Sequence, residues 1–183
     1  MVNRTLGGDG TAFAALVQRY QDRLYNAVFR LVGSPEDARD LLQDAFIKAY
    51  ENLGGFRGGS SLYTWLFRIA VNTALSHRRK RKWAHASLAS AAEGEQGGEA
   101  AWADPSAPDP ADPVMAAETE ALVQHALGDL DEEHRAVIVL RDIQHCDYRE
   151  MAEILDVPTG TVKSRLHRAR LMLREKLRPL LKQ

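Results

Sequence analysis

The chain has 183 residues, of which 45% are hydrophobic and 27% are charged, and its formal net charge is −1 at pH 7. This length allows one domain or two small ones, and the composition is that of an ordinary folded protein rather than a disordered chain. The apolar runs are only a few residues long and the N-terminus has no apolar stretch, so we expect neither a transmembrane helix nor a signal peptide.

The first half of the chain shows the spacing of three helices. Apolar residues recur at helical intervals over residues 11–31, and a glycine follows soon after them. Ser34, followed by proline and two acids, is typical of a helix N-cap and predicts a second helix over residues 35–53. A loop rich in glycine and serine, residues 54–61, precedes a third helix over residues 62–83, which ends in a basic run.

The second half begins with a change of composition. Residues 84–112 are mostly Ala, Gly, Pro, Asp and Glu with few apolar anchors, which is typical of a flexible linker. Beyond this segment, apolar spacing predicts helices over residues 113–127, 132–143, 148–155 and 159–180. No stretch of the sequence shows the alternation that is typical of a strand.

Two of these helices carry start signals. Asp147 with Glu150 three residues later has the pattern of a capping box, and Thr159, after a proline-containing turn, is expected to cap the last helix. We therefore expect an all-α fold of two small helical domains, residues 1–83 and 113–183, joined by the flexible linker. Such lobes can contact separate sites on one large partner.

The small net charge conceals an uneven distribution of charge. Residues 1–85 contain 13 Lys or Arg and 7 Asp or Glu, whereas residues 86–121 contain 8 Asp or Glu and no Lys or Arg. Residues 159–183 contain 8 Lys or Arg and a single acid. Clustered Lys and Arg are the electrostatic mark of nucleic-acid binding, so two basic surfaces separated by an acidic segment are predicted.

A short helix, a turn of about four residues and a second helix with basic residues at its start indicate a helix-turn-helix. The apolar side chains of residues 159–180 fall on one face, which directs four polar or basic side chains outward. These four are Lys163, Ser164, His167 and Arg168. A helix fits the major groove of double-stranded DNA, where Lys and Arg donate to guanine. The alternative is that the basic residues only solvate a terminal helix.

Residues 40–46 combine two acids, an amide and a pair of leucines on one predicted helix. Helical spacing turns Leu41 inward, while Asp40, Gln43 and Asp44 point outward. This arrangement suits a face that docks on another protein, but from the residues alone an ordinary amphipathic helix is the favoured interpretation.

Residues 56–68 interleave aromatic side chains with arginine beside the glycine-rich loop. Aromatic faces stack on unpaired bases and arginine holds the backbone, so this pattern indicates single-stranded nucleic acid. Asn72 lies at the edge of the same face, where its amide can read a base, and the basic run 78–82 suits phosphates. The alternative is that the aromatic residues belong to the core, which we expect for Trp65.

In this order and spacing, the three motifs resemble the bacterial extracytoplasmic-function (group 4) sigma factors of the sigma-70 family. Residues 40–46 are similar to region 2.2, which docks on the clamp coiled coil of the RNA polymerase β′ subunit. Residues 56–72 are similar to regions 2.3 and 2.4, which open and read the −10 promoter element. Residues 159–170 are similar to the recognition helix of region 4.2, which reads the −35 element. The resemblance covers nearly the whole chain outside the linker.

The resemblance implies a role for each matching residue. The contact with core polymerase is assigned to Asp40, Leu41, Gln43, Asp44 and Phe46. The contact with −10 DNA is assigned to Phe56, Arg57, Gly58, Ser60, Ser61, Tyr63, Arg68, Asn72, Arg78 and Arg79. The contact with −35 DNA is assigned to Thr159, Thr161, Lys163, Ser164, His167, Arg168 and Arg170.

The resemblance also implies a function and a set of partners. Residues 1–83 would be the region 2 domain and residues 113–183 the region 4 domain of a cytoplasmic transcription-initiation factor. The expected partners are core RNA polymerase, through its β′ clamp and β flap, and promoter DNA, double-stranded at −35 and single-stranded at −10. An anti-sigma factor is also expected, whereas no catalysis, cofactor, metal or small-molecule substrate is.

Two other classes of protein fit parts of the sequence. A plain helix-turn-helix regulator of the response-regulator type shares the C-terminal layout, but it would lack the N-terminal motifs. An enzyme has less support, because the six His are scattered and Cys146 stands next to His145 without metal-ligand spacing. The single cysteine excludes an intrachain disulfide and suits a reducing cytoplasm; we expect it in a loop or partly buried.

Overall fold

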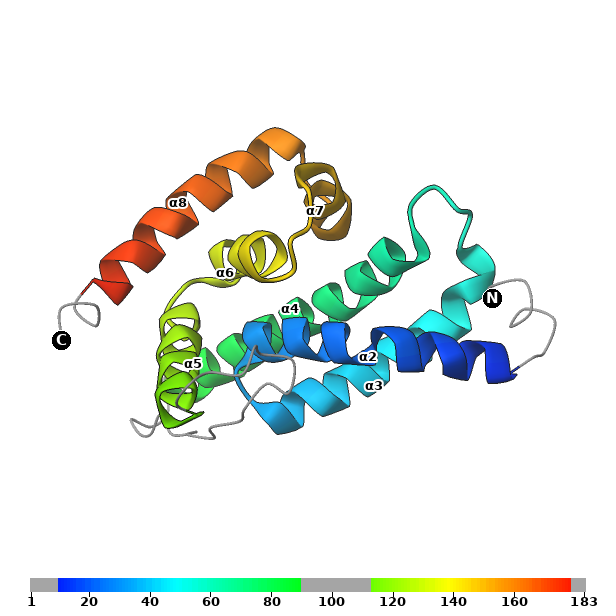
Figure 1. Ribbon diagram of the computed structural model, residues 1–183, viewed down its shortest axis with the longest axis horizontal. Coiled ribbons are helices and arrows are strands. Elements are labelled where there is room, and N and C mark those ends of the chain that lie inside the picture. Colours follow the sequence, from blue (N-terminus) through cyan, green and yellow to red (C-terminus); the bar gives the residue numbers. More distant parts are fainter. Residues whose placement is uncertain (1–9, 90–112, 179–183) are drawn as a thin grey trace.

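The structure, a computed structural model, describes residues 10–89 and 113–178, and these residues are helical with short connections and no strand. The elements, in chain order, are α2 (Gly10–Val32), α3 (Pro35–Asn52), η1 (Leu53–Gly55), α4 (Leu62–Ala89), α5 (Pro113–Gly128), α6 (Glu132–Ile138), η2 (Val139–Ile143), α7 (Tyr148–Leu155) and α8 (Thr159–Leu177) (Figure 1). The expected all-α fold is confirmed. Most of the expected linker, residues 90–112, lies outside the described residues.

Helices α2, α3 and α4 form the N-terminal domain by packing their apolar faces together. The turn between α2 and α3 follows the sequence prediction, since Gly33 has a φ of +84° and the Ser34 hydroxyl accepts a hydrogen bond from the Asp37 backbone N–H at 3.2 Å. Helix α4 continues to Ala89, six residues beyond the predicted end at Trp83. The added residues include three alanines and no glycine or proline, so nothing in them stops a helix.

Helices α5 to α8 form the C-terminal domain. One of the helices expected there changes from α-helical to π-helical hydrogen bonding part of the way along its length. The helix predicted over residues 132–143 is α-helical only to Ile138 and then widens into the π-helical turn η2. The Gln144 backbone N–H accordingly donates to the Val139 carbonyl, five residues earlier, at 2.9 Å. His145 then takes a φ of +58°, which redirects the chain toward α7.

The start of α7 is the predicted capping box, whereas the start of α8 is not as predicted. The Asp147 carboxylate accepts hydrogen bonds from the Arg149 and Glu150 backbone N–H groups at 2.8 Å each, and the Glu150 carboxylate accepts from the Asp147 N–H. The expectation that Thr159 caps α8 is wrong. Pro158 occupies the N-cap position without a side-chain hydrogen bond, and Thr159 is the first helical residue.

The capping box supports a prediction about stability. Asp147→Ala should lower the free energy of unfolding by about 1 kcal/mol, because two backbone N–H groups lose their acceptor. Urea unfolding monitored by circular dichroism measures this change. Asp22→Ala, at an exposed position of α2, is the matched control and should change stability by less than about 0.5 kcal/mol. Equal losses in the two variants would show that the cap contributes nothing to stability.

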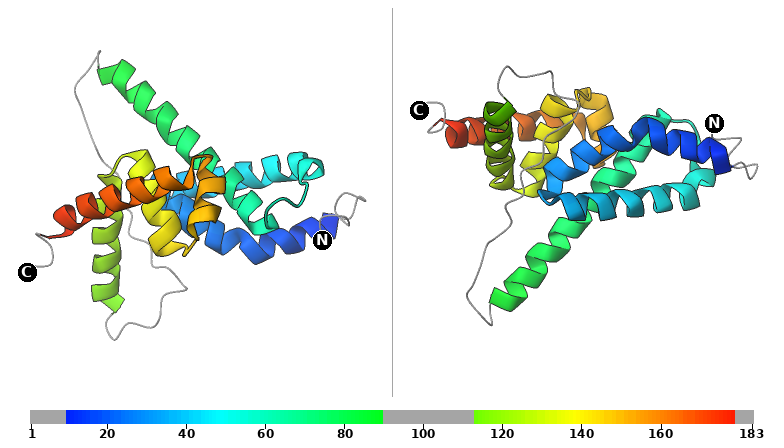
Figure 2. Two further views of the ribbon diagram at one scale, coloured as in Figure 1. Left: turned by 90° about the horizontal axis from the view of Figure 1, so that it is seen from above. Right: turned by 60° about the horizontal axis from the view of Figure 1, so that its bottom comes forward.

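The two domains lie against each other along a surface that we call the seam. It forms where α2 and α4 meet α5, α6, η2 and α7 (Figures 1 and 2). The buried apolar residues of both domains make one continuous cluster. Sequence reasoning expected two lobes reaching separate sites and did not foresee this contact. Apolar periodicity identifies a face that is buried, but it does not identify what buries that face.

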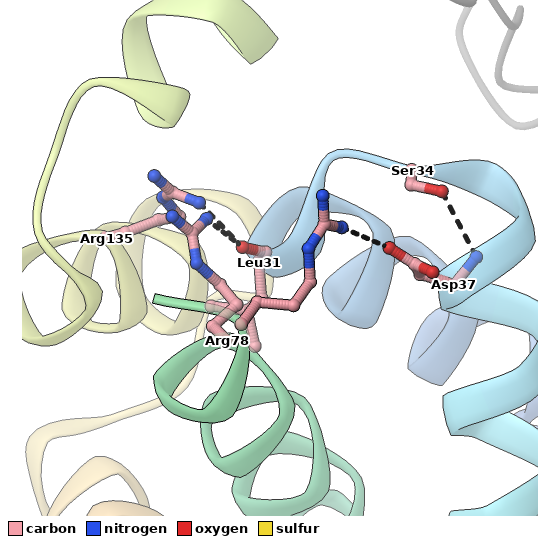
Figure 3. A network of polar contacts seen from close by, with 6 residues as sticks. Leu31, Ser34, Asp37, Arg78 and Arg135 are labelled. Atoms are coloured by element: carbon pink, nitrogen blue, oxygen red, sulfur yellow. Dashed lines mark hydrogen bonds and ion pairs between the residues drawn. The ribbon is translucent and has the colours of Figure 1, made fainter. Parts of the chain in front are cut away.

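Polar contacts at the seam centre on the C-terminal end of α2. The guanidinium groups of Arg78 from α4 and Arg135 from α6 both donate to the Leu31 carbonyl, at 2.7 Å each (Figure 3). Arg135 also donates to the carbonyls of Gly128 and Leu130 at the end of α5. The last carbonyls of a helix lack partners and carry its negative dipole end, so two cations satisfy groups that burial would otherwise leave unpaired.

No helix in the described part of the chain is long and apolar enough to cross a lipid bilayer.

Candidate polymerase and nucleic-acid interfaces

Helix α8 exposes the face that the sequence predicts for DNA. Val162, Leu166 and Ala169 are buried against the rest of the C-terminal domain. The opposite face consists of four exposed side chains, Lys163, Ser164, His167 and Arg168. Helix α7 precedes α8 across a short turn in which Asp156 has a φ of +53°, so the two helices form the helix-turn-helix expected from the sequence (Figure 1).

Two of the other residues predicted to contact −35 DNA interact within the domain: one is hydrogen-bonded to a carboxylate and one is half-buried. Arg170 donates through Nε to the Asp142 carboxylate of η2 at 3.1 Å, and this hydrogen bond raises the pKa of its guanidinium. Thr161 is half-buried, and its carbonyl accepts from the Ser164 hydroxyl at 3.0 Å. Arg168 has no such contact among the described residues, which leaves its guanidinium available to a base edge.

Helix α3 presents the predicted docking motif as an exposed stripe. Leu41 is buried, and Asp40, Gln43 and Asp44 are exposed on the outer face, as the spacing predicts. Phe46 is half-buried and packs edge-on against Phe13 of α2, so it supports the helix from the side.

The same stripe continues into apolar side chains that sequence reasoning did not assign to any site. Ile47 is 49% exposed and follows Asp44 by one helical turn. Tyr50 is 54% exposed and packs against Phe13 with ring centroids 5.1 Å apart. Asp40, Gln43, Asp44 and Ile47 follow the i, i+3, i+4, i+7 spacing of one helix face. Helical periodicity alone could therefore have placed Ile47 on this face.

The loop before α4 holds most of the exposed residues predicted for −10 DNA. Arg57 and Gly58 are exposed, and Gly58 has a φ of +73°, a conformation that favours glycine. Phe56 is half-buried and its ring lies 5.5 Å from the Trp65 ring, so Trp65 anchors the loop and is half-buried rather than part of the core. Ser60 is half-buried beside the start of α4.

Ser61 has a structural partner in the same region. Its hydroxyl accepts from the Thr64 backbone N–H at 3.0 Å and lies 2.7 Å from the Thr64 hydroxyl, which makes it a cap for the first turn of α4. Phe67, which the sequence left open between a base-stacking and a core role, is fully buried. The aromatic residues of this segment therefore have two structural roles: Phe67 packs in the core of the domain, and Trp65 packs against Phe56 of the surface loop.

The residues predicted for −10 DNA along α4 fall into two groups. Asn72 and Arg79 are exposed, so their side chains are accessible. Tyr63, Arg68 and Arg78 are half-buried at the seam. Burial raises the pKa of Tyr63 to about 12, against a smaller opposing effect of the Arg23 guanidinium, which lies 4.5 Å from the ring centroid.

Arginines at the seam were missed by sequence reasoning. Arg23 donates to the Gln144 carbonyl at 3.4 Å, Arg30 forms an ion pair with Glu120, and Arg135 donates to the carbonyls described above. Arg30 and Arg135 are buried, which is rare for arginine and requires partners. The partners that they contact across the seam are 90 or more residues away in sequence, so no local signal could have identified those contacts.

Neither a metal site nor a reactive thiol stands out in the part of the chain that the structure describes. Within the described ranges, no three potential metal-ligating side chains from His, Cys, Asp or Glu come together. Cys146 is 3% exposed, and burial raises the pKa of its thiol to about 11. Sequence reasoning expected a loop or partly buried cysteine; the structure places it in the connection before α7 and buries it fully.

Both halves of the chain match families of known proteins. The family model for sigma-70 region 2 matches residues 16–84, and the model for sigma-70 region 4 matches residues 120–173. The RNA polymerase sigma-H factor of Pseudomonas aeruginosa is 39% identical over 186 aligned positions, which cover 100% of this chain and 95% of that protein. The ECF RNA polymerase sigma-E factor of Escherichia coli K12 has the same identity and coverage.

Two solved structures are similar to this chain over nearly its full length. The sigma factor RpoE of Bartonella quintana, in complex with the anti-sigma factor NepR, has a TM-score of 0.71 at 28% identity and covers 91% of this chain and 97% of its own. CnrH, in complex with the cytosolic domain of CnrY, has a TM-score of 0.68 at 29% identity and covers 97% and 95%. The chain belongs to the extracytoplasmic-function RNA polymerase sigma factors of the sigma-70 family.

Proposed function

We propose that this sigma factor divides promoter recognition between its domains. The region 4 domain, residues 113–183, reads the −35 element as duplex, and the region 2 domain, residues 1–83, opens and holds the −10 element. Residues 84–112 join them. The observation that supports this division most strongly is the α8 face, where four exposed polar or basic side chains lie opposite a fully buried apolar face.

Docking on core polymerase is assigned to the exposed stripe of α3. Asp40, Gln43 and Asp44 provide charge and hydrogen-bonding groups for the β′ clamp, and the adjacent Ile47 provides an exposed apolar surface of the kind found at docking sites. Leu41 supports this stripe from beneath and Phe46 supports it from the side. A second contact, between the β flap and the region 4 domain, completes the attachment.

Opening of the −10 element is assigned to the loop 56–61 and the exposed side of α4. The loop provides Arg57 and a glycine backbone that lets a base approach closely, and Asn72 reads bases at the edge of the melted region. Arg79 binds the backbone electrostatically. Because Ser61 caps α4, its role at the −10 element is to fix the loop in place.

The mechanism needs no bond chemistry from this chain. We infer that the protein acts in the cytoplasm as a non-catalytic subunit, without a cofactor or a small-molecule substrate, and that free energy from polymerase docking and DNA contacts opens the promoter. An anti-sigma factor is proposed as a further partner, since the RpoE structure that this chain resembles contains one.

Association with polymerase tests the proposal against a plain helix-turn-helix regulator. The purified chain should comigrate with core RNA polymerase in gel filtration and should make that polymerase promoter-specific. A chain that binds duplex DNA alone and leaves core polymerase unchanged would support the regulator instead. The match to region 2 over residues 16–84 already disfavours this alternative, because such a regulator has no need of that domain.

A pair of arginine variants tests the assignment of the α8 face. Arg168→Ala should weaken −35 binding by about 1–3 kcal/mol and relax base preference at one position, because its free guanidinium donates to a base edge. Arg170→Ala is the matched control; it removes an arginine held by Asp142 and should leave base preference unchanged. Fluorescence anisotropy with promoter duplexes varied at each −35 position measures both. If Arg168→Ala weakened all sequences equally, Arg168 would contact phosphate.

A further inference from the structure

The basic side chains of α8 are held in two different ways. Three of them pair with carboxylates of the same domain, namely Arg165 with Glu133, Arg170 with Asp142 and Lys176 with Asp129. A carboxylate fixes the position of a cation but also offsets its charge, which weakens the attraction of that cation for an acceptor on DNA. These three pairs are therefore better suited to fastening α8 to its domain than to reading bases.

Lys163 is held by an aromatic ring instead. Its ammonium nitrogen lies 5.6 Å from the centroid of the Tyr148 ring, which is within the range of a cation–π interaction. Among the described residues, no carboxylate forms an ion pair with Lys163. A neutral ring restricts where the side chain can point and leaves its positive charge uncompensated. Because an ammonium has three N–H donors, those turned away from the ring stay available to base acceptors.

The start of α7 fixes the Tyr148 ring in place. The capping box of Asp147 and Glu150 sets the backbone of the first turn, and Tyr148 is the first helical residue. Its ring is half-buried and packs against the apolar core. Lys163 lies in the second turn of α8, so this contact joins the first helix of the helix-turn-helix to the second.

Arg141 of η2 lies against the same ring. Its guanidinium carbon is 5.0 Å from the ring centroid, and its Nη1 donates to the Cys146 carbonyl at 2.7 Å, which ties it to the connection before α7. Two like charges beside one ring repel each other, which disfavours rotamers of Lys163 that fold back toward η2. The ring and Arg141 together therefore narrow the positions that are open to the exposed Lys163 ammonium.

We propose that Tyr148 is a positioning residue for −35 recognition, whose ring holds Lys163 in the orientation in which the ammonium donates to a base edge in the major groove. This inference rests on the proposed role of the α8 face. An unrestrained lysine loses the rotational freedom of a long side chain when it binds, whereas a lysine that a ring already confines loses less. Tyr148 thus contributes to affinity and base preference through Lys163, without itself touching DNA.

The contact between the ring and the ammonium can be tested without DNA. An aromatic ring shifts the NMR signals of protons that lie over its face upfield. The ε-methylene protons of Lys163 should therefore resonate upfield of those of the other lysines in the full chain, and Lys163→Met identifies the signal by its loss. Tyr148→Phe should keep the shift and Tyr148→Leu should abolish it. An unshifted signal in the wild type would overturn the contact.

Binding of a −35 duplex to the full chain, measured by fluorescence anisotropy, tests the role in recognition. The probe is the duplex that the wild-type chain enriches from a pool randomised at the −35 element. Tyr148→Leu should weaken binding about two- to fivefold, as expected for the loss of one cation–π contact at an exposed site. Tyr148→Phe keeps the ring and should bind as the wild type does. Equal losses in the two variants would assign the effect to the hydroxyl and overturn the inference.

A double-mutant cycle separates positioning from a general loss of structure. In a Lys163→Met background, Tyr148→Leu should have no further effect, whereas in an Arg168→Ala background its full effect should persist. Tyr148→Leu and Lys163→Met should also relax base preference at the same position of the duplex. Equal effects of Tyr148→Leu in both backgrounds, or a preference lost at every position, would show that the ring only supports the fold of the domain.

Failure of the proposed function would give a different result. A wild-type chain that enriches no sequence from the pool would show that the α8 face does not read DNA, and the role of Tyr148 would be overturned with it. A wild-type chain that enriches a sequence, but in which Tyr148 and Lys163 act independently, would overturn the positioning role alone.

Discussion

Replacing Arg135 with methionine is expected to lower the free energy of unfolding by about 3 kcal/mol. Arg135 is 1% exposed and donates to three carbonyls, those of Leu31, Gly128 and Leu130. Methionine fills similar space without donors, so the carbonyls at the end of α5 lose their charged partner while they stay buried. Arg78 continues to donate to the Leu31 carbonyl, which limits the loss at the seam.

Urea unfolding monitored by circular dichroism measures this effect, and Arg174→Met provides the control. The Arg174 side chain is 70% exposed and its nearest carboxylate, that of Glu175, lies 3.6 Å away at the surface. Its replacement should change stability by less than about 0.5 kcal/mol. A loss in Arg135→Met no larger than that of the control would mean that the buried guanidinium stabilises neither the seam nor the end of α5.

Reversing the charge at Asp44 is expected to weaken binding to core polymerase by about 2–3 kcal/mol, roughly 30- to 150-fold. Asp44 is exposed at the centre of the α3 stripe, between Gln43 and Ile47, so Asp44→Lys places a cation where the proposed interface has a carboxylate. A surface substitution of this kind leaves the core of the domain intact, and circular dichroism should show an unchanged helical content.

Titration of fluorescently labelled chain with core polymerase measures that affinity. Asp22→Lys makes the same change of charge at an exposed position of α2, away from the stripe, and should reduce affinity by less than about threefold at physiological salt. Comparable losses in both variants would show that polymerase responds to net charge. The α3 stripe would then not be its docking site.

Local signals predicted the helices well where a helix start depends on neighbouring residues. Ser34 and Asp147 both cap the helices expected from the sequence, because each cap is formed with a backbone N–H two or three residues away. Thr159 failed as a cap because Pro158 precedes it and takes the N-cap position. The π-helical turn η2 was also missed, since its widened hydrogen bonding leaves no pattern in the order of apolar residues.

The candidate sites were predictable where they depend on helical spacing, and less so where they depend on tertiary contact. The outward faces of α3 and α8 follow from the position of their buried residues, so Asp44 and Arg168 lie where the sequence places them. Ser61 and Arg170 are predicted to bind DNA, and the structure shows an intramolecular partner for each that the sequence did not indicate. The cover over Tyr63 comes from a domain that begins some 50 residues later in the chain.

The central claim is that two helical domains of one chain read one promoter from both ends. Run-off transcription tests it most directly, with core polymerase and a library of templates randomised upstream of the start site. The account predicts two enriched sequence blocks at a fixed spacing, and enrichment only when the chain and core polymerase are both present. A single enriched block, or enrichment that the chain achieves without polymerase, would contradict it.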